Sequence, residues 1–405
     1  MVCTVHIQHA EVGSRPRVVG LSAAFLLIVV LLASACGGGD QNPFGLQSEL
    51  VTPADRADAL AFDPEGRLFY AEHWSGNIRV VTPDGQLLEE PFATVPDVAA
   101  NANWGLTGLA LDAEFEDNHY VYAYFTELLD PGPPPIGRPV IIRFTDVDNE
   151  GTEPTVIVAD LMEANPDQPF NANGSIHLGP DGFLYATLGD YDMPRDVGPQ
   201  NKEVPQDLGT PIGKILRIRP EDGTAPADNP FVDQPSADPR IFAYGFRNAF
   251  DFAFNPETGK MYGSDSTGPT CEELNVVEIG GNYGWPIAGE WPYTDCLFSM
   301  ETPAIHFFAL EGMQPGDFTS TVGVRGMEFV SGDVYPTLGD SLLVCESAPG
   351  LIRRLVLEGT GSDEVVADDV VVRDCEFAMA ISPDGIIYYS NQSEIRRLVP
   401  IDSSE

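Results

Sequence analysis

Basic residues are scarce in this sequence. It has 21 Lys and Arg against 62 Asp and Glu, which gives a formal net charge of −41 at pH 7. A protein that binds nucleic acid needs a basic patch for the phosphate backbone, so this class is excluded. Two interpretations of the acidity remain open: a solvated acidic surface that favours solubility, and carboxylate oxygens that bind Ca²⁺.

Cysteine is also scarce, with six residues, and no Cys-x-x-Cys pair or histidine at ligand spacing supports a zinc site. Cys3 and Cys36 belong to the N-terminal segment discussed below. The other four cysteines allow three disulfide pairings. Pairing between neighbours in the sequence is favoured, which predicts Cys271–Cys296 and Cys345–Cys375.

Amphipathic helix patterns are missing, whereas Gly (40) and Pro (35) are abundant and point to turns between short strands. One unit recurs: a short apolar strand, a turn that often contains Asp-Gly or Glu-Gly, an aromatic strand and a later strand. Gly in such a turn accepts a positive φ without steric cost. Six copies occur, at 60–81, 108–126 with 140–144, 175–190 with 213–220, 252–265, 326–332 with 340–357, and 379–398.

Six repeated antiparallel sheets with long loops at one end predict a six-bladed β-propeller of four-stranded sheets. A β-sandwich needs only about seven strands in total, fewer than this sequence offers. We expect the propeller to span residues 50–399 and residues 400–405 to form a C-terminal tail.

The N-terminus has the features of an export signal. Arg15 and Arg17 precede an apolar run at 18–33, and small residues lead to Cys36. This pattern predicts a lipoprotein signal peptide at 1–35, lipidation of Cys36 and a flexible tether at 36–49. The protein would then be anchored to the outer face of the bacterial cytoplasmic membrane, or lie in the periplasm. An uncleaved membrane anchor is the alternative.

The longest specific motif is AYGFRNAFDFAFNPETGKMYGSDSTGPTCEELNVVEIGGNYGWP at 243–286. It resembles the matching stretch of the soluble quinone-dependent glucose and aldose dehydrogenases, the glucose/sorbosone dehydrogenase family. GLTGLALDAEFEDNHYVYAYFT, GPDGFLYATLGD, GKILRIRP and PADNPF resemble the same family in the same order, so the resemblance covers most of the chain beyond the signal.

The resemblance implies that pyrroloquinoline quinone (PQQ) lies on one face of the propeller, held by Ca²⁺ and by cationic side chains. A His would take the proton of a sugar hydroxyl while hydride passes to the quinone. The positions that match the cofactor site are Asn103, Arg247, Asn248, Thr267, Gly268 and Pro269, and the last two would also ligate Ca²⁺ through their carbonyls.

A second calcium site is implied at Glu273 and Tyr283, and Asp265 and Glu272 add carboxylates to the same loop. Without a cation, such crowding would cost stability through repulsion. A solvated acidic loop is the alternative.

Other family positions are replaced. Asn171 stands where the catalytic His is expected and Phe170 at the neighbouring carboxylate. Asn cannot accept a proton at neutral pH, so glucose oxidation through PQQ should be weak or absent. The cationic positions fall at Ala348, Cys375 and Phe377, and Arg373 could substitute only with a shift in register.

Two histidines are candidates for a relocated base. His73 stands where family members place a residue of the cofactor face, although a role in the turn is equally open. His177 lies six residues after Asn171, an even offset that would put both on one face of a single strand. Packing between blades is the preferred interpretation of His177.

Two functions therefore remain. The first is a PQQ-dependent sugar dehydrogenase that acts on a sugar or small polyol and passes electrons to an unidentified acceptor. The second is a degenerate propeller that keeps Ca²⁺ and binds a carbohydrate or protein in the cell envelope without turnover.

Overall fold

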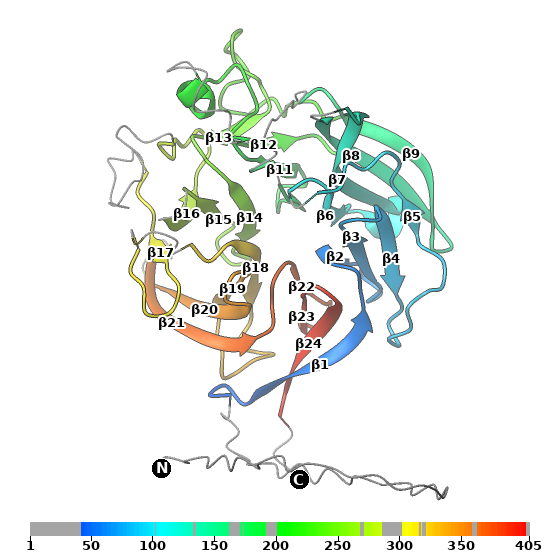
Figure 1. The fold of residues 1–405 in the computed structure, drawn as a ribbon, viewed down its shortest axis with the longest axis vertical. Coiled ribbons are helices and arrows are strands. Elements are labelled where there is room, and N and C mark those ends of the chain that lie inside the picture. The colour runs from blue at the N-terminus through cyan, green and yellow to red at the C-terminus, as the bar shows by residue number, and fades with distance from the viewer. Residues whose placement is uncertain are drawn as a thin grey trace, which may run out of the picture. The chain divides into compact units, whose positions relative to one another are not determined.

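The computed structural model describes residues 42–101, 103–132, 135–161, 171–172, 174–191, 201–267, 271–285, 302–315, 317, 321–358 and 363–401. These residues form six four-stranded antiparallel sheets arranged around a central axis (Figure 1). The predicted six-bladed β-propeller is confirmed.

Every blade has four strands, from an innermost strand near the axis to an outermost strand at the rim. Blade 1 is β2 (Ala57–Phe62), β3 (Leu68–Glu72), β4 (Asn77–Val81) and β5 (Ala93–Thr94), blade 2 is β6 (Leu106–Leu111), β7 (Tyr120–Asp130), β8 (Ile136–Val147) and β9 (Glu150–Val158), and blade 3 is β10 (Ile176–Leu178), β11 (Leu184–Leu188), β12 (Lys214–Ile218) and β13 (Ile241–Tyr244). Blade 4 is β14 (Ala249–Phe254), β15 (Met261–Ser266), β16 (Glu272–Val277) and β17 (His306–Phe308), blade 5 is β18 (Val324–Val330), β19 (Ser341–Glu346), β20 (Leu351–Glu358) and β21 (Glu364–Arg373), and blade 6 is β22 (Met379–Ile381), β23 (Ile387–Ser390), β24 (Glu394–Pro400) and β1 (Leu46–Pro53).

Helix contributes little to the described part of the chain. It contains the four-residue α1 (Phe115–Asn118) and the 3-10 helix η2 (Asn201–Gln206). No helix among the described residues is long and apolar enough to cross a membrane. The expected signal peptide at 1–35 and the lipidation residue Cys36 lie outside the described residues.

The two ends of the propeller are joined within one blade. β1 pairs antiparallel with β24, from Leu46 opposite Pro400 to Pro53 opposite Glu394, so the first strand of the chain completes the last sheet (Figure 1). The propeller therefore begins at Leu46 and not at residue 50. The described part of the expected tether also contacts blade 5, because the Asn42 side chain donates to the Val371 carbonyl at 2.7 Å.

The hydrophobic core is divided among the blade interfaces. Side chains of a strand alternate between the two faces of its sheet, and here both faces meet a neighbouring blade, so all five residues of β3 and of β11 are buried. Apolar clusters occur between each pair of adjacent blades. This burial explains why the repeats read as nearly continuous apolar runs.

Local turns and a cross-link behave as the sequence indicated. Gly182 and Gly385 adopt φ values of 78° and 83° in their Asp-Gly turns. Cys345 and Cys375 form the predicted disulfide, which ties β19 of blade 5 to the segment before β22 of blade 6. Cys271 is also disulfide-bonded, and its predicted partner Cys296 lies outside the described residues.

Candidate functional site

The six innermost strands, β2, β6, β10, β14, β18 and β22, begin at one end of the propeller, which we call the upper face. Contacts between strand starts of different blades define it. Thr107 at the start of β6 donates to the Gly174 carbonyl, just before β10, at 2.9 Å. The Arg325 guanidinium at the start of β18 lies 4.6 Å from the centre of the Phe250 ring in β14. Sequence segments far apart in the chain therefore meet at this end.

Most residues matched to the cofactor site lie on this face. Asn103 precedes β6, Asn171 precedes β10, and Arg247 and Asn248 directly precede β14. Thr267 follows β15, whose hairpin partner β16 leads back from the same end. Gly268 and Pro269 lie outside the described residues. The described positions therefore lie at one end of the propeller.

Asn171 is fixed by a carboxylate. Its Nδ2 donates to Asp190 Oδ1 at 2.8 Å, and the other oxygen of Asp190 accepts from Trp285 Nε1 at 2.9 Å. Asn171 has a φ of 50°, a left-handed conformation that Asn tolerates well. The residue precedes β10 rather than lying in it, so the expectation that Asn171 and His177 share one strand was wrong.

Arg247 and Asn248 are held by Asp265. Asp265 Oδ2 accepts the Arg247 backbone N–H at 3.0 Å and Oδ1 accepts that of Asn248 at 2.6 Å. The Arg247 guanidinium donates from Nη1 to the Ser266 carbonyl at 2.9 Å, while its Nε is buried and has no hydrogen-bond partner among the described residues. The Oδ1 atom of Asn248 is also buried and unpaired. These two atoms can meet polar groups of a ligand.

The three carboxylates expected to crowd one calcium loop are divided between two faces of blade 4. Asp265 and Glu273 are directly opposite each other on β15 and β16. Glu272 points the other way and accepts the backbone N–H groups of Gly323 and Val324 of blade 5, at 3.2 and 2.9 Å. Glu272 therefore does not join the other two.

Asp265 and Glu273 form a buried acidic pair. Burial raises the pKa of Asp265 to about 7. Burial, followed by the like charge of Asp265, raises the pKa of Glu273 well above its ordinary value. Glu273 Oε1 accepts from Thr267 at 3.3 Å, whereas Oε2 is buried and has no hydrogen bond of normal geometry with any described residue, although the Asn275 amide is close enough to lower the Glu273 pKa. An unpaired carboxylate oxygen beside a second carboxylate suits a cation that prefers oxygen ligands.

Two further observations give less support to a calcium site. The Tyr283 hydroxyl donates to the Val276 carbonyl at 2.7 Å and accepts from the Glu278 N–H at 2.8 Å, so it is fully engaged. No group of three or more His, Cys, Asp or Glu side chains among the described residues is arranged to hold a metal ion. Asp265 and Glu273 are thus the described carboxylates that could contribute to binding a cation.

Both histidines are paired with a carboxylate. His73 is fully buried, with Nδ1 at 2.7 Å from Asp58 Oδ2 and Nε2 at 2.7 Å from the Asn101 carbonyl, so both ring nitrogens are engaged. The hypothesis of a relocated base at His73 was wrong for this reason. His177 Nε2 contacts Asp251 Oδ1 of the next blade at 2.6 Å, which agrees with the expected role between blades.

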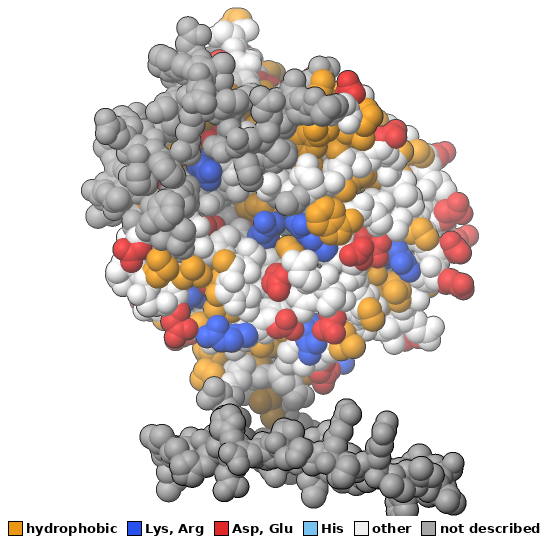
Figure 2. Space-filling model, in the orientation of Figure 1, with side chains coloured by type: hydrophobic (Ala, Val, Ile, Leu, Met, Phe, Trp, Pro, Cys, Tyr) orange, Lys and Arg blue, Asp and Glu red, His pale blue; other side chains and the backbone are white. Residues whose placement is uncertain are grey.

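Sequence analysis missed two arginines of the upper face. Arg56 directly precedes β2, and Arg325 is the second residue of β18. The Phe377 ring lies 4.8 Å from the Arg56 guanidinium and 5.6 Å from that of Arg325. Figure 2 shows Lys and Arg side chains gathered near the middle of the molecule, with many Asp and Glu side chains along the rim. Aligning the starts of the six repeats would have placed both arginines on this face.

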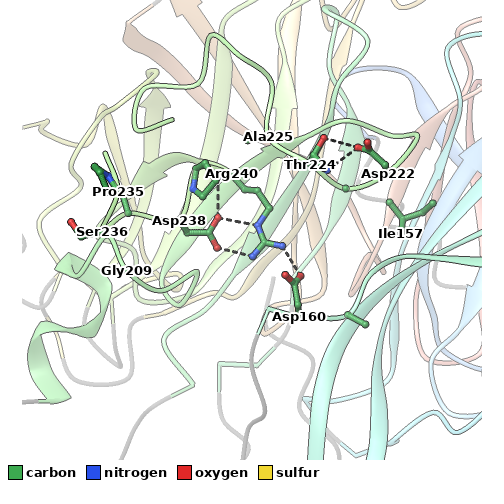
Figure 3. Close-up of a pocket in the computed structure, with 14 residues that line it drawn as sticks. Ile157, Asp160, Gly209, Asp222, Thr224, Ala225, Pro235, Ser236, Asp238 and Arg240 are labelled. Carbon is green, nitrogen blue, oxygen red and sulfur yellow. Dashed lines mark hydrogen bonds and ion pairs between the residues drawn. The ribbon is translucent and has the colours of Figure 1, made fainter. Parts of the chain in front are cut away.

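A separate cavity of about 740 Å³ lies where β9 of blade 2 meets the loops around β13 of blade 3 (Figure 3). Its principal cation, Arg240, is paired with Asp160 at 2.6 Å and with Asp238 at 2.7 Å. Because Arg240 is paired with these two carboxylates, its charge does not require a ligand in the cavity.

The fold and the site together define the class of this protein. It is a six-bladed propeller with polar and cationic groups at the end where its inner strands begin. The chain belongs to the glucose/sorbosone dehydrogenase family, whose model matches residues 54–399. The aldose sugar dehydrogenase YliI of Escherichia coli is 25% identical over 90% of this chain and 94% of its own. Quinoprotein glucose dehydrogenase B of Acinetobacter calcoaceticus is 29% identical, over 59% of this chain and 52% of its own.

Solved structures agree with this placement. An oxidoreductase of Thermus thermophilus, described as a glucose dehydrogenase, superimposes with a TM-score of 0.70 at 28% identity, over 88% of this chain and all of its own. The family implies PQQ and Ca²⁺ as cofactors. The residues present fit a carboxylate-bearing cofactor at Arg247 and Arg325, which keep unpaired guanidinium nitrogens.

Proposed function

We propose that the protein is a PQQ-dependent oxidoreductase that acts on a sugar or small polyol at the upper face. The observation that carries this proposal is the Arg247–Asn248 pair. Asp265 fixes both backbones, yet Arg247 Nε and Asn248 Oδ1 are buried and have no hydrogen-bond partner in the part of the chain that the structure describes. Buried polar atoms of this kind are costly unless a ligand pairs with them.

PQQ would supply the redox chemistry by accepting hydride from the substrate carbon. Arg247 would donate a hydrogen bond to the bound cofactor or substrate, and Asp265 would keep it in place. Asn171, whose Nδ2 donates to Asp190, cannot take the hydroxyl proton, because an amide is not a base at neutral pH. Loss of a general base costs about 10²–10⁴-fold in rate, so turnover of glucose should be slow.

The proposal is tested by titrating the protein with PQQ and Ca²⁺ while following absorbance, and then measuring dye reduction with a panel of aldoses and polyols. Arg247→Gln should weaken PQQ binding and slow any turnover. The matched control is Arg397→Gln, a partly exposed arginine of the outer strand pair that contacts Glu49. Normal PQQ binding and turnover in Arg247→Gln would remove Arg247 from the site.

A second candidate function is binding of a carbohydrate without turnover. It is favoured by the fixed Asn171, which leaves a hydrogen-bonding amide where a base would be needed. Sugar binding measured by calorimetry, without reduction of PQQ under any condition, would select this function over the first.

We also propose that Ca²⁺ binds beside Glu273 and that the chain is exported and lipidated on Cys36. The support for Ca²⁺ is the unpaired Glu273 Oε2 next to Asp265. The support for lipidation is the signal pattern that ends at Cys36. Labelling of the wild type with radioactive palmitate, and loss of the label in Cys36→Ser, is the expected result; equal labelling of both would contradict it.

A further inference from the structure

Arg325 stands where four blades meet. It belongs to the inner strand of blade 5, and its guanidinium contacts the Phe250 ring of blade 4 and lies near the Phe377 ring that precedes β22 of blade 6. It also interacts electrostatically with Asp58 of blade 1. Side chains from blades 1, 4, 5 and 6 can converge only close to the axis of a six-bladed propeller. Arg325 therefore lies at the centre of the upper face.

Arg325 interacts electrostatically with Arg56 and with two carboxylates, Asp58 and Glu272. Arg56 binds Asp58 through two hydrogen bonds, from Nε at 2.9 Å and from Nη2 at 3.1 Å, so one carboxylate already serves one arginine. Arg325 Nη1 is buried and makes no hydrogen bond with any described residue. Burial, together with the like charge of Arg56, lowers the pKa of Arg325. A further anion would relieve both the desolvation and the repulsion.

The surroundings of the two arginines suit a flat ligand. The buried Phe377 ring contacts both guanidinium groups, and Trp74, 43% exposed, lies 5.1 Å from the Arg56 guanidinium. An exposed aromatic side chain such as Trp74 can pack against a planar or sugar ring while a guanidinium holds a carboxylate on that ring.

We propose that Arg325, supported by Arg56, is a carboxylate-binding site at the centre of the upper face, in place of the cations that are replaced at Ala348, Cys375 and Phe377. The ligand is a ring compound that carries a carboxylate. It is either PQQ, with several carboxylates, or an acidic sugar substrate. The inference rests on the proposed function, because it names the residue that recognises the negative charge of a ligand on the same face. The experiment below distinguishes the two sources of the carboxylate.

The experiment compares wild type, Arg325→Gln, Arg325→Lys and the control Arg397→Gln, each first checked for an unchanged circular dichroism spectrum and melting temperature. PQQ binding is followed by absorbance in the presence of Ca²⁺. Binding of glucuronate and of glucose to the PQQ-free protein is followed by calorimetry. Loss of one charge-assisted contact should weaken binding by about 10–100-fold in Arg325→Gln, and Arg325→Lys should recover part of it.

The outcomes separate the sources. Weaker PQQ binding in Arg325→Gln, without a preference for glucuronate over glucose in the wild type, assigns the site to the cofactor. A preference for glucuronate that disappears in Arg325→Gln assigns it to the substrate. Equal affinities of wild type and Arg325→Gln for both ligands, or no binding of either by the wild type, overturns the inference. If Arg325→Gln does not fold, the same comparison is made between wild type and Arg325→Lys.

The failure of the proposed function has a different signature. PQQ that binds and is reduced by sugars, with equal affinity in Arg325→Gln, leaves the oxidoreductase proposal intact and removes the Arg325 site. Glucuronate binding that depends on Arg325 in a protein that never binds PQQ keeps the site and removes the oxidoreductase proposal.

Discussion

At the scale of single residues, the upper face carries some residues that match cofactor positions of the family and replaces others. Asp190 illustrates this. One of its oxygens accepts from Asn171 and the other from Trp285, so it holds the residue that stands at the family's His position. A carboxylate in this place could equally orient an imidazole, as in many acid–base sites.

Asn171→His should therefore increase turnover of PQQ-loaded protein. His tolerates the left-handed φ of position 171, and one ring nitrogen could donate to Asp190 while the other accepts the substrate proton. We expect a rise in kcat of about 10²-fold above neutral pH, with a new fall in rate below about pH 6.5. The control is Asn171→Ala, which supplies no base. Equal rates and equal pH profiles in the two variants would contradict the prediction.

The residue scale also shows what sequence could and could not predict. The YGFRN and GPTCEELN motifs could indicate that Arg247, Asn248 and Thr267 lie near one another, because all three belong to blade 4. Arg56 and Arg325 come from blades 1 and 5, and their proximity depends on closure of the ring. The error about His73 has the same origin, since a sequence gives its position in a turn but not the two buried partners that engage its ring.

At the scale of elements, strands were predictable where both faces are buried. The inner and middle strands carry nearly continuous apolar residues and Asp-Gly turns, which are local signals. β1 was missed in part because an outermost strand is half exposed and its sequence, LQSELVTP, lacks an apolar pattern. Its place is set by pairing with β24, at the other end of the chain.

β12 depends on one buried ammonium group. Lys214, at its first residue, is fully buried and its Nζ donates to the carbonyls of Val204, Pro205 and Ile212, at 3.1, 2.9 and 2.7 Å. Lys214→Met leaves these acceptors unpaired, which should lower the free energy of unfolding by about 2–4 kcal/mol. Urea denaturation measures the change. Lys260→Met, in an exposed turn, should change it by less than about 0.5 kcal/mol, and similar values for both variants would show that the three hydrogen bonds do not support β12.

At the scale of the whole molecule, the ring places titratable groups of successive blades against one another. His177 of β10, Asp251 of β14 and Glu328 of β18 form such a group, in which Asp251 contacts His177 at 2.6 Å and accepts the Met327 N–H at 2.9 Å. Burial raises the pKa of Glu328 to about 7. Asp251 raises the pKa of His177 against the opposing effect of burial.

Both shifts lower stability as the pH rises. Glu328 has an ordinary value of 4.5 in the unfolded chain, so the folded state gains protons relative to the unfolded one between about pH 4.5 and 7, and stability falls across that window. The His177 contribution is complete below pH 6.5 and is lost above it as the folded state releases its proton. We expect a higher melting temperature at pH 5.5 than at pH 8, and a smaller difference in Glu328→Gln. An identical difference in Glu328→Gln and wild type would exclude Glu328 as its source.

Ca²⁺ should stabilise the propeller more at high pH than at low pH, which is opposite to the effect of Glu328 and His177. Asp265 and Glu273 must be ionised to bind a cation, and burial raises the pKa of both. Bound Ca²⁺ would remove their mutual repulsion and pair the free Glu273 Oε2. Because a ligand of the folded state stabilises by mass action, millimolar Ca²⁺ should raise the melting temperature relative to excess chelator, and more at pH 8 than at pH 5.5.

Glu273→Gln should lose this response, whereas Glu257→Gln, in an exposed turn of the same blade, should keep it. A melting temperature that does not differ between Ca²⁺ and chelator at pH 8 would show that blade 4 closes without a cation.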